Sequence, residues 1–210
     1  MTDNTNDFAT KFANALEGMF ESVALTRKQH FIDNPTKRPS QQDIDSIVKR
    51  YANQNAVIAG AANLIPGPLG MLAALPELVA VIGNQIQMIY DLGVAHGKEA
   101  SLSSELLLGF FSTVIGERTI GLVTVKGSQL LLKKASVQVL QKIIFWLGGS
   151  ISQKLLKRFV AKWLPIVGVV AMVLWSRQST IEMGEKASRL LAMTIVNSEE
   201  EVTINEIPID

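Results

Sequence analysis

Hydrophobic side chains recur at intervals of three and four residues near the start of the chain, as they do on one face of an α-helix. The members of this face are Phe8, Phe12, Ala15, Leu16, Met19 and Val23. The pattern predicts one amphipathic helix from about Asn6 to Phe31, within an N-terminal region of residues 1–34. Pro35 and Pro39 follow. Proline ends a helix because it lacks the backbone N–H and clashes with the preceding turn.

A second helix is predicted to begin at Ser40-Gln-Gln-Asp43, which has the form of a capping box. No charged residue occurs from Asn53 to Pro76, a length that could span a bilayer. However, prolines and glycines cluster in the middle of this stretch, at Pro66, Gly67, Pro68 and Gly70. Such a cluster predicts a turn. We therefore expect two shorter helices joined by an apolar hairpin that is buried or dips into a membrane.

The helix predicted after Pro76 is apolar over most of its circumference. At 100° per residue, its polar side chains fall within one narrow stripe. These side chains are Glu77, Asn84, Gln87, Asp91 and Lys98. The interpretation that we favour is a core helix that touches water along one seam. The alternative is a polar functional groove.

Helical segments are also predicted in the second half of the chain. Val123 to Leu147 has the pattern of one long helix, which Gly148-Gly149 is expected to end. Ile151 to Leu164 is expected to form an interfacial helix, and Pro165 to break it before a last apolar helix. The acidic end, residues 195–210, is predicted to be flexible or to lie across basic residues.

These patterns together predict an all-α protein. Residues 41–194 would form a compact domain of about seven or eight helices around one hydrophobic core. Two apolar hairpins broken by proline and glycine, near Pro66 and near Pro165, would lie at its centre. The 210 residues of the chain suit a single domain.

Charge is distributed unevenly, although the net charge is only +1. Residues 118–181 contain ten lysines and arginines, all three tryptophans, and no aspartate or glutamate. Basic side chains interleaved with apolar ones suit an anionic lipid surface, where each Lys or Arg contributes about 1 kcal/mol. The residues predicted to meet head groups or to enter the acyl boundary are Lys133, Lys134, Trp146, Lys154, Lys157, Arg158, Phe159, Lys162 and Trp163.

The sequence nominates no catalytic or metal-binding residues. It has no cysteine, which excludes disulfides and thiolate metal sites. His30 and His96, its two histidines, lack the partner spacing of a metal site. Gly93 to Lys98 has the wrong spacing for a phosphate-binding loop and lacks the serine or threonine that should follow the lysine. We therefore expect a non-enzymatic protein with no cofactor and no metal.

Two stretches of the chain match the motif order of a known family. The first is Ala59-Gly60-Ala61-Ala62, Ile65 to Gly70 and Ala73-Ala74-Leu75-Pro76, followed by a glutamine-bearing helix that ends at Ala95-His96-Gly97. The second is Ala161 to Gly168, followed by a helix through Met183 to Ala187. Between Gln54 and Leu191 the chain resembles the bacterial EcsC family, but it has Ala74 where an acid would precede the second proline. The resemblance implies a compact, hydrophobic, peripheral membrane protein, in a family named from an ABC-transporter operon.

The function that these features predict is docking on anionic lipid at the cytoplasmic, inner face of the membrane. Secretion is not expected, because the polar and acidic start of the chain lacks the order of a secretory signal. Two alternatives stay open: a soluble protein that inserts its apolar hairpin and permeabilises a membrane, and a protein-interaction module with an apolar groove. Nucleic acid is a poorer partner, because aliphatic residues and tryptophan separate the cations where stacking aromatics in a polar groove would be needed.

Overall fold

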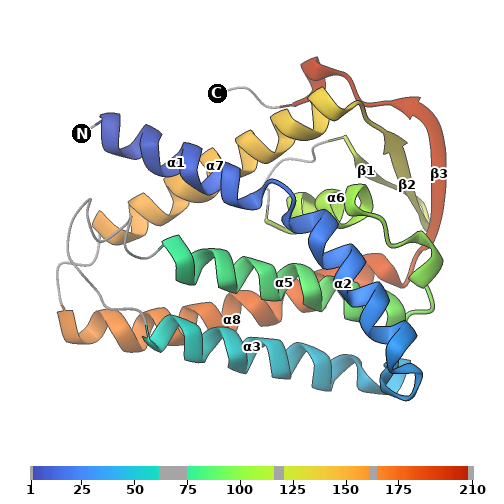
Figure 1. Ribbon diagram of the computed structural model, residues 1–210, viewed down its shortest axis with the longest axis horizontal. Helices are drawn as coiled ribbons and strands as arrows, with labels where there is room; N and C mark the ends of the chain where they lie inside the picture. Colours follow the sequence, from blue (N-terminus) through green and yellow to red (C-terminus); the bar gives the residue numbers. More distant parts are fainter. Residues whose placement is uncertain (1, 62–74, 116–120, 161–164, 208–210) are drawn as a thin grey trace.

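The computed structural model describes residues 2–61, 75–115, 121–160 and 165–207, with the side chains of 8–60, 75–115, 121–153 and 173–207. The fold is mostly helical, as the sequence predicts, and it includes a small three-stranded sheet (Figure 1). The prediction of an all-α fold is therefore confirmed for the helical majority of the chain and needs correction for the sheet.

The N-terminal region forms two helices, where the sequence predicts one. Helix α1, Thr2–Leu16, and helix α2, Met19–Asp33, meet at Gly18, whose φ is +77°. Glycine adopts this left-handed conformation without the steric cost that other residues meet. The apolar spacing continues across the break, so periodicity alone conceals it. Both helices contribute to the same hydrophobic core as the rest of the chain, through residues such as Phe12 and Phe20.

Helix α5, Leu75–Ala95, lies among the other helices (Figure 1). It contacts α2, α3 (Ile44–Ala61), α6 (Ser104–Ile115) and α8 (Pro165–Leu191). Figure 1 shows α3 and α8 side by side below α5, and these two helices make extensive contact. Of the described helices, only α5 is long and apolar enough to cross a bilayer, yet 61% of its most apolar window is buried inside the protein, as in a core helix.

Helix α7 runs without interruption from Val137 to Val160, so the predicted stop at Gly148-Gly149 is wrong. Gly148 is buried and faces α1, where an added Cβ atom would lie 3.0 Å from the Cβ of Ala13. The glycine therefore serves a close helix–helix approach and does not end the helix. The predicted interfacial segment Ile151 to Leu164 is the end of α7 as far as residue 160, and residues 161–164 lie outside the described residues.

Strands replace the first half of the long helix predicted over Val123 to Leu147. Strand β1, Val123–Lys126, pairs antiparallel with β2, Gln129–Lys134. Gly127, with φ of +61°, lies in the two-residue turn between them. β-Branched residues before a two-residue Gly-Ser turn are a hairpin signal, and this signal outweighs the helical spacing of the leucines that follow the turn.

The acidic end of the chain is the third strand. Strand β3, Thr194–Glu201, pairs in parallel with β2, and the side chains of Val202 and Ile207 beyond it are buried. Of the two predictions for this segment, flexibility is wrong for residues 195–207, because strand pairing and two apolar anchors attach them. The other prediction, that the segment lies across basic residues, agrees with its ion pairs to Lys133 and Lys134. The predicted hairpin residues Pro66, Gly67, Pro68 and Gly70 lie outside the described residues.

Candidate functional site

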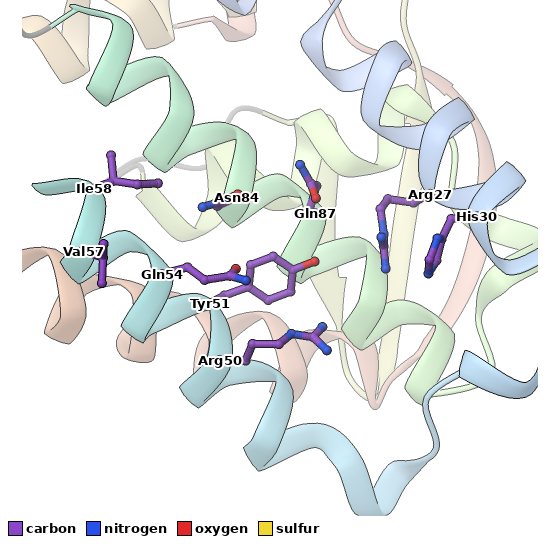
Figure 2. Close-up of a pocket in the computed structure, with 9 residues that line it drawn as sticks. All are labelled: Arg27, His30, Arg50, Tyr51, Gln54, Val57, Ile58, Asn84 and Gln87. Carbon is purple, nitrogen blue, oxygen red and sulfur yellow. The ribbon is translucent and has the colours of Figure 1, made fainter. Parts of the chain in front are cut away.

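A cleft of about 720 Å³ lies between α2, α3 and α5 (Figure 2). Its size is within the range of about 300–1,000 Å³ that small-molecule sites occupy. The lining residues are Arg27 and His30 from α2, Arg50, Tyr51, Gln54, Val57 and Ile58 from α3, and Asn84 and Gln87 from α5. None of them is acidic.

The polar stripe of α5 provides one wall of this cleft. Asn84 and Gln87 line it, while Asp91, one helical turn beyond Gln87, is buried. Residues three and four positions apart lie on the same side of a helix, so the three side chains share one face. The stripe thus faces a cleft as well as the core, and a functional role for this groove stays a prediction.

Asp91 holds the cationic end of the cleft together. Its carboxylate is 1% exposed and accepts hydrogen bonds from Arg27 Nε at 2.8 Å, Arg50 NH2 at 3.0 Å and the Tyr51 hydroxyl at 2.9 Å. Burial raises the pKa of Asp91, and the two guanidinium groups and Tyr51 oppose that shift. Burial also raises the pKa of Tyr51, which keeps its proton available for the bond to Asp91.

The cluster carries excess positive charge. Two guanidinium groups face one carboxylate, and aromatic rings support both: Arg27 lies 4.8 Å from the ring centroid of Phe31 and Arg50 lies 5.0 Å from that of Tyr51. Each arginine has five N–H donors in a fixed plane, and the Arg50 side chain is still 54% exposed. The cleft therefore presents oriented, partly unsatisfied donors to an anion.

The opposite end of the cleft is apolar. Figure 2 shows Val57 and Ile58 at one end, Arg27 and His30 at the other, and the amides of Gln54, Asn84 and Gln87 between the ends. Val57 is 72% exposed, so its side chain is accessible to a ligand at this end of the cleft. The lining of the cleft thus changes along its length from cationic side chains to aliphatic ones.

A buried network of neutral polar groups supports the middle of the cleft. Asn55 on α3 is fully buried and donates to Thr180 Oγ1 on α8 at 3.0 Å and to the Val81 carbonyl on α5 at 3.3 Å. Asn84 Nδ2 donates to Asn55 Oδ1 at 2.9 Å. Because three helices share these bonds, the network fixes both their spacing and the orientation of Asn84.

The predicted site residues whose side chains the structure describes, Lys133, Lys134 and Trp146, do not line this cleft. Lys133 pairs with Glu200 and Glu206, and Lys134 with Glu199, so the acidic tail neutralises both lysines. Trp146 is half-buried on α7 and packs against the core.

The remaining predicted residues are not tested. Lys154, Lys157, Arg158 and Phe159 belong to the last two turns of α7, but their side chains are outside the described part, as are Lys162 and Trp163 entirely. Their proposed contacts with lipid stay a prediction. On the described part of α7, Lys142 and Phe145 are both exposed, Phe145 to 53%.

The sequence analysis did not identify Arg27 and Arg50 as site residues, although one feature of the sequence indicates that a buried cation should be present. Asp91 is the only charged residue between Glu77 and Lys98 in an otherwise apolar helix. A carboxylate in such a setting needs cationic partners, because burying an unpaired charge is very costly. That requirement does not say which of the chain's arginines would meet it.

Among the described side chains, no group of three or more His, Asp or Glu residues is placed to hold a metal ion. Comparison with models of protein families, with curated proteins and with solved structures found no match for this chain. The resemblance to the EcsC family therefore stays a prediction.

Proposed function

We propose that this protein is a non-enzymatic, peripheral membrane protein that docks on anionic lipid and takes the anionic group of an amphiphile into the α2–α3–α5 cleft. The observation that carries the proposal is the polarity of the cleft, with two arginines at one end and Val57 at the other. An amphiphile has the same two ends, a charge and a hydrocarbon, in the same order.

The anion would bind at the arginines without changing the protein's own ion pairs. Arg27 contacts Asp91 through Nε and Nη2, and Arg50 through Nη2. Among the described residues these two guanidinium groups have no other hydrogen-bond acceptor, and each has five N–H donors in all. Hydrogen bonds to a charged group contribute about 1.5–3 kcal/mol each. The cation-rich stretch 118–181 would add general attraction to an anionic surface without selecting a ligand.

Sedimentation with vesicles tests the docking. Phosphatidylcholine vesicles with and without phosphatidic acid are compared at low salt. We expect recovery of the protein only with the anionic vesicles, and equal recovery with both would refute the proposal.

The contribution of the cleft is measured with Arg50→Gln, which leaves the Arg27–Asp91 pair intact. Losing one charge-assisted hydrogen bond predicts about tenfold weaker binding. Arg189→Gln is the matched control, since it removes the same charge at an exposed position near the end of α8. Equal losses in the two variants would mean that the cleft is not the site.

The sequence-predicted surface needs its own variant. Lys157→Gln with Arg158→Gln removes two cations from the end of α7. If this surface provides general attraction, the double variant weakens vesicle binding most at low salt and little at high salt, because salt screens exposed charges. A loss that is the same at every salt concentration would argue against this role.

A further inference from the structure

The middle of the cleft contains a hydrogen-bond acceptor whose orientation can be derived from the buried network. The Thr180 hydroxyl has one proton and donates it to the Ser176 carbonyl at 2.8 Å. Thr180 Oγ1 can therefore only accept from the two amides that reach it, those of Asn55 and Gln85. The amide of Asn55 must consequently turn its nitrogen toward Thr180.

The orientation of the Asn55 amide determines that of Asn84, which lies in the wall of the cleft. Both hydrogens of Asn55 Nδ2 are used, one by Thr180 and one by the Val81 carbonyl, which leaves Asn55 Oδ1 as an acceptor. Asn84 must then present its nitrogen to Asn55, as the 2.9 Å bond shows. Among the described residues the Asn84 side chain makes only this hydrogen bond, which leaves its Oδ1 without a protein donor, and Asn84 lines the cleft. The cleft thus contains a fixed acceptor between its cationic and apolar ends.

A ligand that fills the cleft must supply a donor to this oxygen. Asn84 and Asp91 are seven residues apart on α5, which is roughly 10 Å at 1.5 Å per residue. The anion would bind the guanidinium groups of Arg27 and Arg50, which lie against Asp91, so the ligand must carry its donor group on the segment between its anion and its hydrocarbon chain. A hydroxyl group on the carbon backbone of a phosphate ester, as in glycerol phosphate, meets this requirement.

From this geometry, and on the basis of the proposed function, we propose that the cleft selects a single-chain phosphate ester with a free hydroxyl between chain and phosphate, the chemistry of a monoacyl glycerol phosphate. Phosphate would lie at Arg27 and Arg50, the hydroxyl would donate to Asn84, and the chain would leave over Val57 and Ile58. A phosphatidic acid with two chains lacks the hydroxyl, because both glycerol oxygens of its backbone are acylated.

The experiment is calorimetric titration of the wild-type protein with monoacyl glycerol phosphate and with its deoxy analogue, both below their critical micelle concentrations. One hydrogen bond predicts roughly threefold to tenfold weaker binding of the analogue. Asn84→Ala should bind both ligands with the same affinity, and Gln87→Ala, which removes an amide without a fixed orientation, should keep the discrimination. Equal affinities in the wild-type protein would overturn the inference, whatever the folding of the variants, and so would discrimination that persists in a folded Asn84→Ala.

Two further ligands separate this inference from the proposed function. Monoacylglycerol without phosphate should not bind, and if it binds as well as the phosphate ester, the anionic site itself is refuted. If both phosphate esters bind equally but more tightly than monoacylglycerol, the proposed function stands and only the hydroxyl selection fails. Glycerol 3-phosphate tests the source of the ligand: weak binding supports a lipid, and affinity equal to that of the acylated ester would assign the cleft to a soluble phosphate ester.

Discussion

Among the described residues, paired charges cluster at the cationic end of the α2–α3–α5 cleft and along strands β2 and β3. In the first, Asp91 is 1% exposed and joins groups from two other helices. In the second, Glu199 and Glu200 are 91% and 70% exposed and pair with neighbouring lysines of an adjacent strand. The contacts have similar lengths, but water competes for the second set and is nearly excluded from the carboxylate of the first.

Burial decides what each cluster can do. Exposed ion pairs contribute little to stability and are screened by salt. A buried carboxylate contributes specificity of position, because removing it leaves charges without a partner in a place that water reaches poorly. The Asp91 cluster therefore orients two arginines for a ligand, whereas the β2–β3 pairs mainly cancel the charge of Lys133 and Lys134.

The sharpest test of this difference is removal of one charge from each cluster. Asp91→Asn should lower the free energy of unfolding by about 3 kcal/mol, because Arg27, 17% exposed, loses its counter-ion. Glu199→Gln makes the same chemical change in the exposed cluster and should have no measurable effect on stability. Urea denaturation of both variants measures the two changes in the free energy of unfolding. Equal changes would contradict the proposed difference between the buried and the exposed cluster.

A neutral buried cluster gives an intermediate case. Thr180→Val keeps the volume of the side chain but removes the acceptor of one N–H of Asn55 and one N–H of Gln85, which should cost about 1–3 kcal/mol of unfolding free energy. Thr26→Val is the matched control, since Thr26 bonds only to the carbonyls of its own helix. The loss in Thr180→Val should not change with salt. A strong salt dependence would show that the network acts through nearby charges.

The helical part of the fold was predictable, and the sheet was not. Apolar spacing located α3 and α5, because a helix that buries one face repeats every three or four residues. It failed at Gly18 and Gly148, where the same residue type serves a break in one case and a close contact with α1 in the other. It failed again at β3, because pairing of an acidic segment with β2 depends on a partner more than sixty residues away.

The site was predictable only in its α5 wall. The stripe that ends in Asp91 marked the polar side of the helix, but the arginines that complete the cleft lie 64 and 41 residues away in the sequence. The distribution of charge along the sequence favoured residues 118–181, where lysine and arginine are most frequent. Two of the lysines nominated there are neutralised by Glu199 and Glu200, a pairing that appears only when β3 joins the sheet.

The smallest expected effect is the response of the exposed cluster to pH. Hydrogen bonds from Lys134 and Lys133 hold the pKa values of Glu199 and Glu200 below the ordinary 4.5. A lowered pKa means that the folded state favours the charged carboxylate, so the contribution to stability is present above pH 4.5 and is lost as the pH falls through the lowered value. Burial shifts the pKa of Asp91 in the opposite direction.

Carbon-detected NMR titration of the glutamate and aspartate carboxyl groups measures these pKa values directly. The variant Lys133→Gln with Lys134→Gln should return both glutamates to ordinary values while leaving the titration of Asp91 unchanged, since the two clusters share no residue. Lys133 and Lys134 meet Glu200 and Glu199 because β3 pairs with β2. Ordinary pKa values of these two glutamates in the wild-type protein would therefore mean that β3 is not paired with β2 in solution. The cations of β2 would then be open to an anionic surface, and the exposed cluster, as well as the buried one, would have to be considered for lipid binding.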